Sequence, residues 1–426
     1  MQLERAPIHR ALTLATATLL AGSVMAEENG VELQLSQMYY SEQNRVDVNT
    51  SQIALSKTLR EGDTVKLGFT YDAMTGASPN GRKVPLGSQN QTVPITTASG
   101  FTFSAQSGKS AGASQTWLTE FKDNRNAGTL DWDHTLTRNI NTSLGVNISQ
   151  EDDYRSRGAS AVANIDLNEK RTTISVGASA SQDTVDPNGG IPNGLGLVAC
   201  ATNTASFQPA WIDCNATRTR YKPGDKVATT VFLGATQLWN RQTLTQMNFT
   251  HSNLDGYLTD PYKQLSVLSD SFNGEVAVVY EKRPDQRSTN SLLLKSVHTL
   301  GDQAINASYR YYWDDWAIRA HTADIHTRFD FGSRWFLQPH LRYSRQGAAS
   351  FFRPELSATG TKPTYASADH RLGSQITATF GIKAGLAFSK QAKLTLRVER
   401  MTQDYRGTTL PDLDAWIVQM TFRNEF

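Results

Sequence analysis

The most constraining feature of this chain is the alternation of apolar and polar residues over positions 416–426. Trp416, Val418, Met420, Phe422 and Phe426 share one register, and within it only Asn424 is polar. A period of two over this length is that of a β-strand with one apolar and one polar face. An ordinary strand at the edge of a sheet alternates in the same way. The pattern therefore predicts a strand before it predicts a fold.

The position of this strand adds information, because the chain ends on it with an aromatic residue, Phe426. This arrangement resembles the C-terminal signal of Gram-negative outer-membrane β-barrels. The resemblance implies a protein inserted into lipid by the barrel-assembly machinery, with the bilayer and lipopolysaccharide as its surroundings.

The beginning of the chain predicts export. Arg5 and Arg10 precede an uncharged stretch from Ala11 to Met25, which ends in Val24-Met25-Ala26. A charged region, an apolar region and a small residue at the cleavage position describe a secretory signal peptide. We expect residues 1–26 to be removed. No later segment approaches the roughly 18 uninterrupted apolar residues of a helical membrane span.

The composition is compatible with a barrel and argues against a nucleic-acid partner. Only 38% of the residues are apolar, and the formal net charge is +2. So small a charge gives no electrostatic footprint for nucleic acid. A barrel with a wet lumen can be this polar and still face lipid, because only alternate strand residues touch the bilayer. Helical periodicity is almost absent.

The same alternation recurs in sixteen segments of about the length that crosses a membrane as a strand. In chain order they are 31–40, 46–59, 63–73, 126–138, 140–152, 155–167, 170–182, 225–239, 242–256, 286–299, 303–315, 317–331, 333–347, 368–388, 391–405 and 412–426.

The connections between these segments follow a regular rule. Tight turns follow the even-numbered segments, whereas longer or more variable connections follow the odd-numbered ones, with long loops at about 74–125, 183–224 and 257–285. Short periplasmic turns and long extracellular loops are typical of outer-membrane barrels. The sequence therefore predicts that residues 27–426 form an all-β, up-and-down antiparallel transmembrane barrel of about 16 strands.

The only two cysteines, Cys200 and Cys214, both lie in the second long loop. Because an exported chain meets an oxidising compartment, we expect a disulfide that closes this loop. A thiolate metal site is disfavoured because no histidine lies nearby. No Cys-x-x-Cys-His motif is present, so we expect no covalent haem, and the sequence predicts neither a bound metal nor a cofactor.

Strand parity assigns a set of charged residues to the lumen. It comprises Lys295, Arg310, Asp324, His326, Arg328, His340, Arg342, Lys383, Arg397 and Arg423. Rings of Arg and Lys select for anions, so one interpretation is a selectivity wall. The other is a ladder of ion pairs that only satisfies charge inside a wet tube. The sequence leaves both open.

The segment 310–316 (RYYWDDW) is the densest polar and aromatic stretch in the chain. Asp314 and Asp315, with His321, predict either a cation site or a hydrolytic site at the outer rim. The alternative is an aromatic girdle with acidic residues at its tip, which is the commoner arrangement in barrels.

Four strings carry a resemblance to a known family: 71–81 (YDAMTGASPNG), 310–316 (RYYWDDW) with His321-Thr322, 339–343 (PHLRY) and 367–372 (SADHRL). From about residue 31 onward the chain resembles an uncharacterised Gram-negative family of the domain-of-unknown-function series, number thirty-five seventy. The resemblance implies an outer-membrane barrel with no assigned activity and supplies no functional residues, and we expect no enzyme. Members are encoded beside a small lipoprotein, a thioredoxin-like protein and a flavin transferase, which implies a redox-linked envelope system.

Two functions follow as hypotheses. In the first, the barrel is a pore for small anionic solutes, and loop 74–125 gates it. In the second, it is a scaffold for a periplasmic lipoprotein or redox partner that carries its own cofactor. Neither hypothesis fixes an oligomeric state.

Overall fold

Sixteen antiparallel strands close into a single barrel in the computed structural model. The described residues are 30–83, 93–96, 102–105, 116–200, 211–214, 220–270, 274–301, 303–408 and 410–426. The predicted signal peptide lies outside them. Among them, no helix has the length and apolar character needed to cross a membrane.

The barrel strands follow one another around the wall in chain order, so the predicted up-and-down barrel and its strand count are confirmed. They are β1 (Val31–Glu42), β2 (Val46–Arg60), β3 (Asp63–Lys83), β6 (Thr116–Thr137), β7 (Ile140–Gln150), β8 (Tyr154–Leu167), β9 (Thr172–Val185), β13 (Gly224–Leu238), β14 (Thr243–Gly256), β17 (Gln286–Leu300), β18 (Gln303–Asp314), β19 (Arg319–Phe331), β20 (Trp335–Gln346), β22 (Ser374–Ala387), β23 (Ala392–Arg406) and β24 (Leu413–Glu425).

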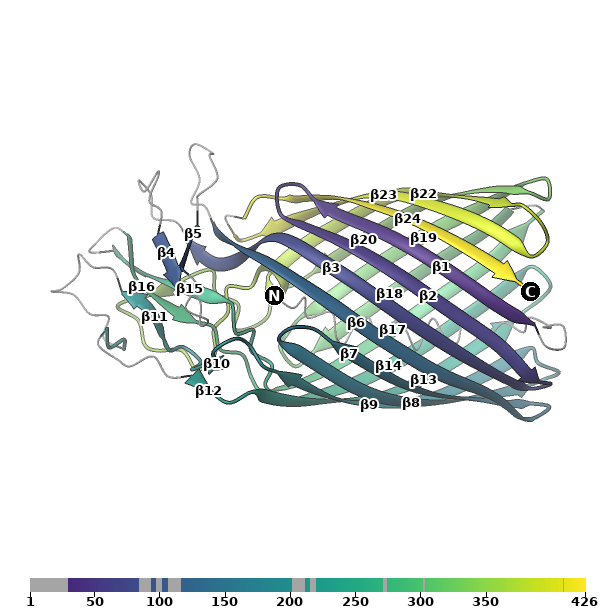
Figure 1. Ribbon diagram of the computed structural model, residues 1–426, viewed down its shortest axis with the longest axis horizontal. Coiled ribbons are helices and arrows are strands. Elements are labelled where there is room, and N and C mark those ends of the chain that lie inside the picture. The colour runs from purple at the N-terminus through teal and green to yellow at the C-terminus, as the bar shows by residue number, and fades with distance from the viewer. Residues whose placement is uncertain are drawn as a thin grey trace.

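The first and last strands close the cylinder. β1 pairs with β24 from Glu32↔Glu425 to Glu42↔Ala415. The Phe426 N–H donates to the Val31 carbonyl at 2.8 Å, so the last residue belongs to the closing seam. Figure 1 places the C-terminus at the end of the barrel that carries the short turns. We call this the turn end, and the opposite end the loop end.

Burial in the barrel is the reverse of burial in a soluble protein. Every barrel strand has at least one large apolar side chain exposed on the outer surface, among them Leu67, Leu144 and Phe380. Many residues of the other register are polar, and several of these are buried, including Thr50, Asn248 and Glu399. An apolar outside and a polar inside define a transmembrane barrel.

Two strands run further than predicted. β3 continues to Lys83 and β6 begins at Thr116, so much of the segment expected as loop 74–125 is paired strand. The turn-forming string 75–81 bends the strand instead of ending it, since Gly76 and Gly81 adopt φ of 130° and 95°. A Cβ at Gly76 would lie 2.0 Å from the Arg45 carbonyl oxygen. The remaining connection, 84–115, is described only at the β4–β5 hairpin (Val93–Thr96 and Thr102–Ala105).

The long connections build a second layer beyond the loop end, which we call the cap: the described parts of 186–223, 257–285 and 347–373. Its main sheet has the order β11 (Leu197–Cys200), β16 (Gly274–Tyr280), β15 (Gln264–Ser269) and β21 (Leu356–Ser357). Figure 1 shows β11, β15 and β16 beyond the barrel wall. The cap also holds the pair β10 (Ile191–Pro192) and β12 (Arg220–Tyr221), and the 3-10 helix η2 (His370–Leu372). The sequence predicted 368–373 as strand, but η2 occupies this segment because Asp369 caps it, accepting from the Arg371 N–H.

The cap has its own apolar core and is tied to β3. Leu265, Val267 and Val279 are fully buried in this core. Cys200 and Cys214 form a disulfide with a Cα–Cα distance of 5.8 Å, and both pack against the same core. The Lys83 N–H donates to Ser266 Oγ at 2.8 Å, which connects the extended end of β3 to β15.

Candidate functional site

The candidate site is the inward face of the wall formed by β17 to β23. Lys295, Ser308, Asp324 and Arg342 follow one another across β17, β18, β19 and β20 in register. Their neighbours Leu294, Tyr309, Ile325 and Leu341 are exposed on the outside. Because strand side chains alternate, the first group faces the lumen. The same argument places all ten predicted residues inward: Lys295, Arg310, Asp324, His326, Arg328, His340, Arg342, Lys383, Arg397 and Arg423.

Two carboxylates of this wall lie within a network of cations. His340 Nε2 lies 2.9 Å from an Asp324 oxygen, and its Nδ1 lies 2.8 Å from a Glu399 oxygen. Arg342 contacts Asp324 at 3.9 Å, and Arg397 contacts Glu399 at 3.8 Å. The negative charges of Asp324 and Glu399 are therefore compensated locally.

A glycine makes this network possible. His340 is on β20 and Glu399 is on β23, and Gly381 of β22 lies between them in register. A Cβ at Gly381 would lie 2.3 Å from Glu399 Cγ. The missing side chain lets Glu399 lie flat along the wall and reach the imidazole.

Replacing Gly381 with alanine is expected to separate His340 from Glu399. The new methyl group must displace the Glu399 side chain, and overpacking of this kind costs about 1–3 kcal/mol of unfolding free energy. Urea unfolding of the refolded barrel, followed by tryptophan fluorescence, measures the loss. Gly128→Ala is the matched control, because its Cβ would meet Ile148 at an ordinary 3.6 Å. Equal stability of the two variants would contradict the expectation.

Three cations of the same wall lack such compensation. Lys295, Arg310 and Lys383 form no ion pair with any residue that the structure describes. Arg328, in contrast, pairs with Asp330 at 2.7 Å. The wall from β17 to β23 therefore carries an excess of positive charge toward the lumen.

The opposite wall has a different balance. In the strand order, β3 and β6 lie across the barrel from β18 to β20. There Lys66 pairs with Asp133 at 2.5 Å, and Arg125 Nε donates to Asp72 at 2.6 Å. Asp131 faces the same way and forms no ion pair among the described residues. Positive charge on one side and a carboxylate on the other produce a field across the lumen.

The predicted rim site is not assembled. Asp314 points inward, where Arg287 pairs with it at 2.7 Å and the Ile318 N–H donates to it at 2.8 Å. Asp315 is exposed, and His321 lies on the outer face, where Tyr309 Oη is 2.6 Å from its Nδ1. His321 pairs in register with Tyr311, so strand parity puts Asp314 and His321 on opposite sides of the wall. The stretch is an aromatic girdle with a hairpin capped by Asp314.

Sequence reasoning missed a buried ionic cluster in the cap. Lys263, Arg283 and Arg371 are brought together with Asp260, Glu281 and Asp369. Arg283 contacts Glu281 and Asp369 at 2.7 Å each, and Arg371 contacts Asp260 at 2.8 Å. Lys263 Nζ also donates to the Pro79 carbonyl of β3 at 2.5 Å. No local pattern marks these residues, because three segments far apart in sequence supply them.

The surroundings of this cluster shift the pKa values of Glu281, Asp369 and the neighbouring His370. Burial raises the pKa of Glu281 to about 7, although Arg283 opposes the shift. Burial would also raise the pKa of Asp369, but Arg371, Lys263 and Arg283 outweigh it and hold that pKa well below its usual range. Burial lowers the pKa of His370 to about 3. Asp369 is thus charged and His370 neutral at pH 7.

Sequence reasoning also missed three converging carboxylates at the loop end, Asp123, Glu151 and Asp153. Among the described residues they are the one group of histidine, cysteine and acidic side chains close enough to share a metal ion. The adjacency of β6 and β7 is implicit in the predicted strand order. The register that brings position 123 to positions 151 and 153 is not.

The fold and its polar lumen define the class of protein: a closed, sixteen-stranded transmembrane β-barrel. Within this class, the chain belongs to the family described as "Protein of unknown function (DUF3570)", which matches residues 9–422. The family predicted from the sequence is therefore confirmed.

Other comparisons add little. No curated protein matches the chain. A bacterial polysaccharide outer membrane secretin is similar over 94% of this chain and 100% of its own, with 8% identity and a TM-score of 0.48. The CymD monoaromatic hydrocarbon channel is similar over 98% and 92%, with 9% identity and a TM-score of 0.42. OccK5 (OpdH) of Pseudomonas aeruginosa is similar over 95% and 100%, with 9% identity and a TM-score of 0.40. Likeness at this level carries no argument about function.

Proposed function

We propose that this protein is a channel of the Gram-negative outer membrane for small anionic solutes. In this proposal the turn end faces the periplasm and the loop end faces the outside, which is the usual orientation of such barrels. The observation that carries the proposal is the group of unpaired inward cations, Lys295, Arg310 and Lys383.

The physical reason is the difference between paired and unpaired charge. A cation held by a carboxylate contributes little to the field that a passing solute feels, whereas an uncompensated cation attracts anions and repels cations. A sixteen-stranded wall can enclose an aqueous channel. With Asp131 on the opposite side, the field across the lumen also orients a solute that carries both charges.

Reversal potentials test the proposal. The mature protein in planar bilayers under a tenfold KCl gradient is expected to prefer chloride over potassium. Replacing Lys295, Arg310 and Lys383 together by glutamine is expected to reduce this preference severalfold, because the uncompensated charge disappears. Arg345→Gln is the matched control, since Arg345 is an exposed arginine on the outer face of β20.

Two results would contradict the proposal. The first is cation preference, or no preference, in the wild-type channel. The second is the absence of conductance both from the wild type and from a variant that lacks residues 84–115. An unchanged reversal potential in the triple variant would show that these cations do not set selectivity.

A further inference from the structure

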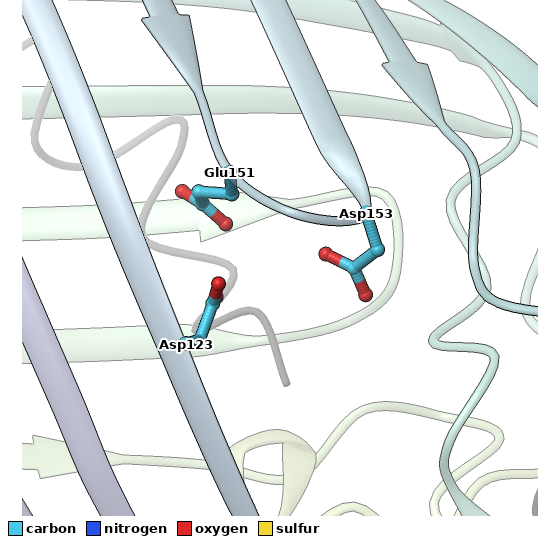
Figure 2. Close-up of side chains that lie close together, drawn as sticks. All are labelled: Asp123, Glu151 and Asp153. Carbon is cyan, nitrogen blue, oxygen red and sulfur yellow. The ribbon is translucent and has the colours of Figure 1, made fainter.

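Three carboxylates converge where the barrel wall meets the cap. Asp123 comes from β6, and Glu151 and Asp153 come from the short connection between β7 and β8. One oxygen from each side chain lies within 4.8 Å of the others. Figure 2 shows the three side chains pointing into a common space between the strands.

Burial makes this arrangement unusual. Asp123 is only 3% exposed and Asp153 only 8%. Both oxygens of Asp123, and Oδ1 of Asp153, are buried and accept no hydrogen bond from any described residue. The backbone N–H groups of Asn124 and Asp152 lie near Asp123 but do not reach it in hydrogen-bond geometry. A buried carboxylate without a partner is costly, so a ligand is needed to balance it.

The chain itself supplies no such ligand within the described residues. No lysine or arginine among them pairs with Asp123 or Asp153. Lys226 lines the same pocket as Asp153, but its Nζ lies over the Tyr154 ring at 5.1 Å from the ring centroid. Among the described residues, the hydrogen bond that the Asp153 side chain accepts comes from a neutral group: the Tyr262 hydroxyl donates to Asp153 Oδ2 at 2.8 Å.

We propose that Asp123, Glu151 and Asp153 bind a divalent cation, and that this cation is calcium in preference to magnesium. The ligand atoms are all carboxylate oxygens, which hard cations prefer. They come from two separate places in the chain and have no octahedral arrangement imposed on them. Calcium accepts irregular oxygen shells of six to eight ligands, whereas magnesium demands near-ideal octahedral geometry.

The site would connect the wall to the cap. Asp153 is bonded to Tyr262, which belongs to the cap segment between β14 and β15. A cation that holds Asp153 beside Asp123 would therefore also hold in place the carboxylate to which Tyr262 of this cap segment is hydrogen-bonded. Calcium at the loop end would stiffen the junction between cap and barrel, whatever solute the lumen passes.

Calorimetric titration tests the site directly. The mature protein, refolded in detergent and stripped with a chelator, is titrated at pH 7 with CaCl2 and separately with MgCl2. We expect one calcium per chain with a Kd of about 10⁻⁴–10⁻³ M, the usual range for extracellular sites. Magnesium is expected to bind at least tenfold more weakly. Asp123→Asn is expected to weaken calcium binding tenfold or more.

The matched control is Asp152→Asn. It also removes one carboxylate charge, from the connection that carries Glu151 and Asp153, but the Asp152 side chain is exposed. Its calcium affinity is expected to stay within twofold of the wild type. Heat-modifiable migration on gels shows whether each variant has folded, and Asp153→Asn replaces Asp123→Asn if the latter fails to fold.

Either of two outcomes would overturn the inference. The first is a wild-type protein that takes up no calcium at millimolar concentration, which by itself decides the matter even if every variant misfolds. The second is equal loss of affinity in Asp123→Asn and Asp152→Asn, which would indicate diffuse surface binding. If the wild type binds no calcium and Asp123→Asn is more stable than the wild type at pH 7, a proton shared by the carboxylates neutralises their charge in place of a cation.

Discussion

Replacing Arg283 with methionine is expected to unfold the cap while the barrel remains folded. Arg283 is fully buried between Glu281 and Asp369, at 2.7 Å from each. Methionine has a similar length but leaves both carboxylates without this cation. Removing one partner of a buried ion pair costs about 3–5 kcal/mol, because the charge that remains is desolvated and uncompensated.

Hydrogen exchange followed by mass spectrometry measures this effect. The amides of β15 and β16 are expected to lose protection by roughly two to four orders of magnitude, since about 1.4 kcal/mol corresponds to a factor of ten. Amides of the barrel strands are expected to keep theirs. Arg353→Met is the control, because Arg353 belongs to the same cap but its side chain is exposed.

A double variant separates charge from packing. Asp369→Asn added to Arg283→Met removes one of the stranded charges, so part of the lost protection is expected to return. If the double variant is as unprotected as the single one, lost packing rather than stranded charge is the cause. Unchanged protection in Arg283→Met itself would mean that the ionic cluster does not hold the cap together.

The barrel could be predicted from sequence because the pattern that specifies it lies in residues close together in the chain. A lipid-facing side chain must be apolar at every second position, as at Leu67 and Phe69, and tight turns such as Glu61-Gly62 separate the strands. The sequence predicts too early an end for β3, because Ser78, Pro79 and Asn80 are turn formers. In the fold, pairing with β6 and contact with the cap stabilise this segment as strand.

The functional sites were harder to predict from sequence, because they depend on the pairing register of neighbouring strands. Asp314 and His321 are close in sequence, but the pairing of Tyr311 with His321 places them on opposite faces. Asp123 and Asp153 are far apart in sequence, yet the β6–β7 register brings them together. A one-residue slip reverses the face of every side chain, so a boundary uncertainty of that size leaves any such site undetermined. The redox partner suggested by the family resemblance stays a prediction.

Acid is expected to open the cap between about pH 4.5 and pH 3, with little change in its stability between pH 6.5 and 4.5. The prediction rests on His370 and Glu281, whose pKa values are displaced in opposite directions. His370 faces Asp369, Lys263, Arg371 and Arg45, and packs edge-on against the Tyr405 ring with a centroid distance of 5.2 Å.

The sign for His370 follows from its lowered pKa, about 3 in the folded cap against 6.5 in the unfolded chain. Between these values the unfolded chain binds a proton that the folded cap does not. Stability contributed by the neutral imidazole is therefore lost as pH falls from 6.5 to 3.

The sign for Glu281 is opposite. Its pKa is about 7 in the folded cap and 4.5 when unfolded, so the folded cap binds the extra proton and gains stability as pH falls from 7 to 4.5. The two slopes cancel where they overlap. Below pH 4.5 the loss from His370 is no longer offset by Glu281 and amounts to roughly 1.4 kcal/mol per pH unit. Asp260 and Asp369, whose folded pKa values lie below 3.8, then add to it.

Two variants make the test specific. Glu281→Gln removes the compensating slope, so the cap is expected to lose stability steadily from pH 6.5 downward. His370→Gln is expected to move the acid transition to lower pH. His298→Gln, on β17 near the turn end and outside the cap, is the control and is expected to behave as the wild type. The exchange rates of the β15 and β16 amides, corrected for the intrinsic effect of pH, report the stability of the cap in all four proteins. Two results would show that His370 and Glu281 do not set the response of the cap to acid. One is a wild-type cap whose protection falls steadily from pH 6.5, and the other is a Glu281→Gln cap whose protection stays constant between pH 6.5 and 4.5.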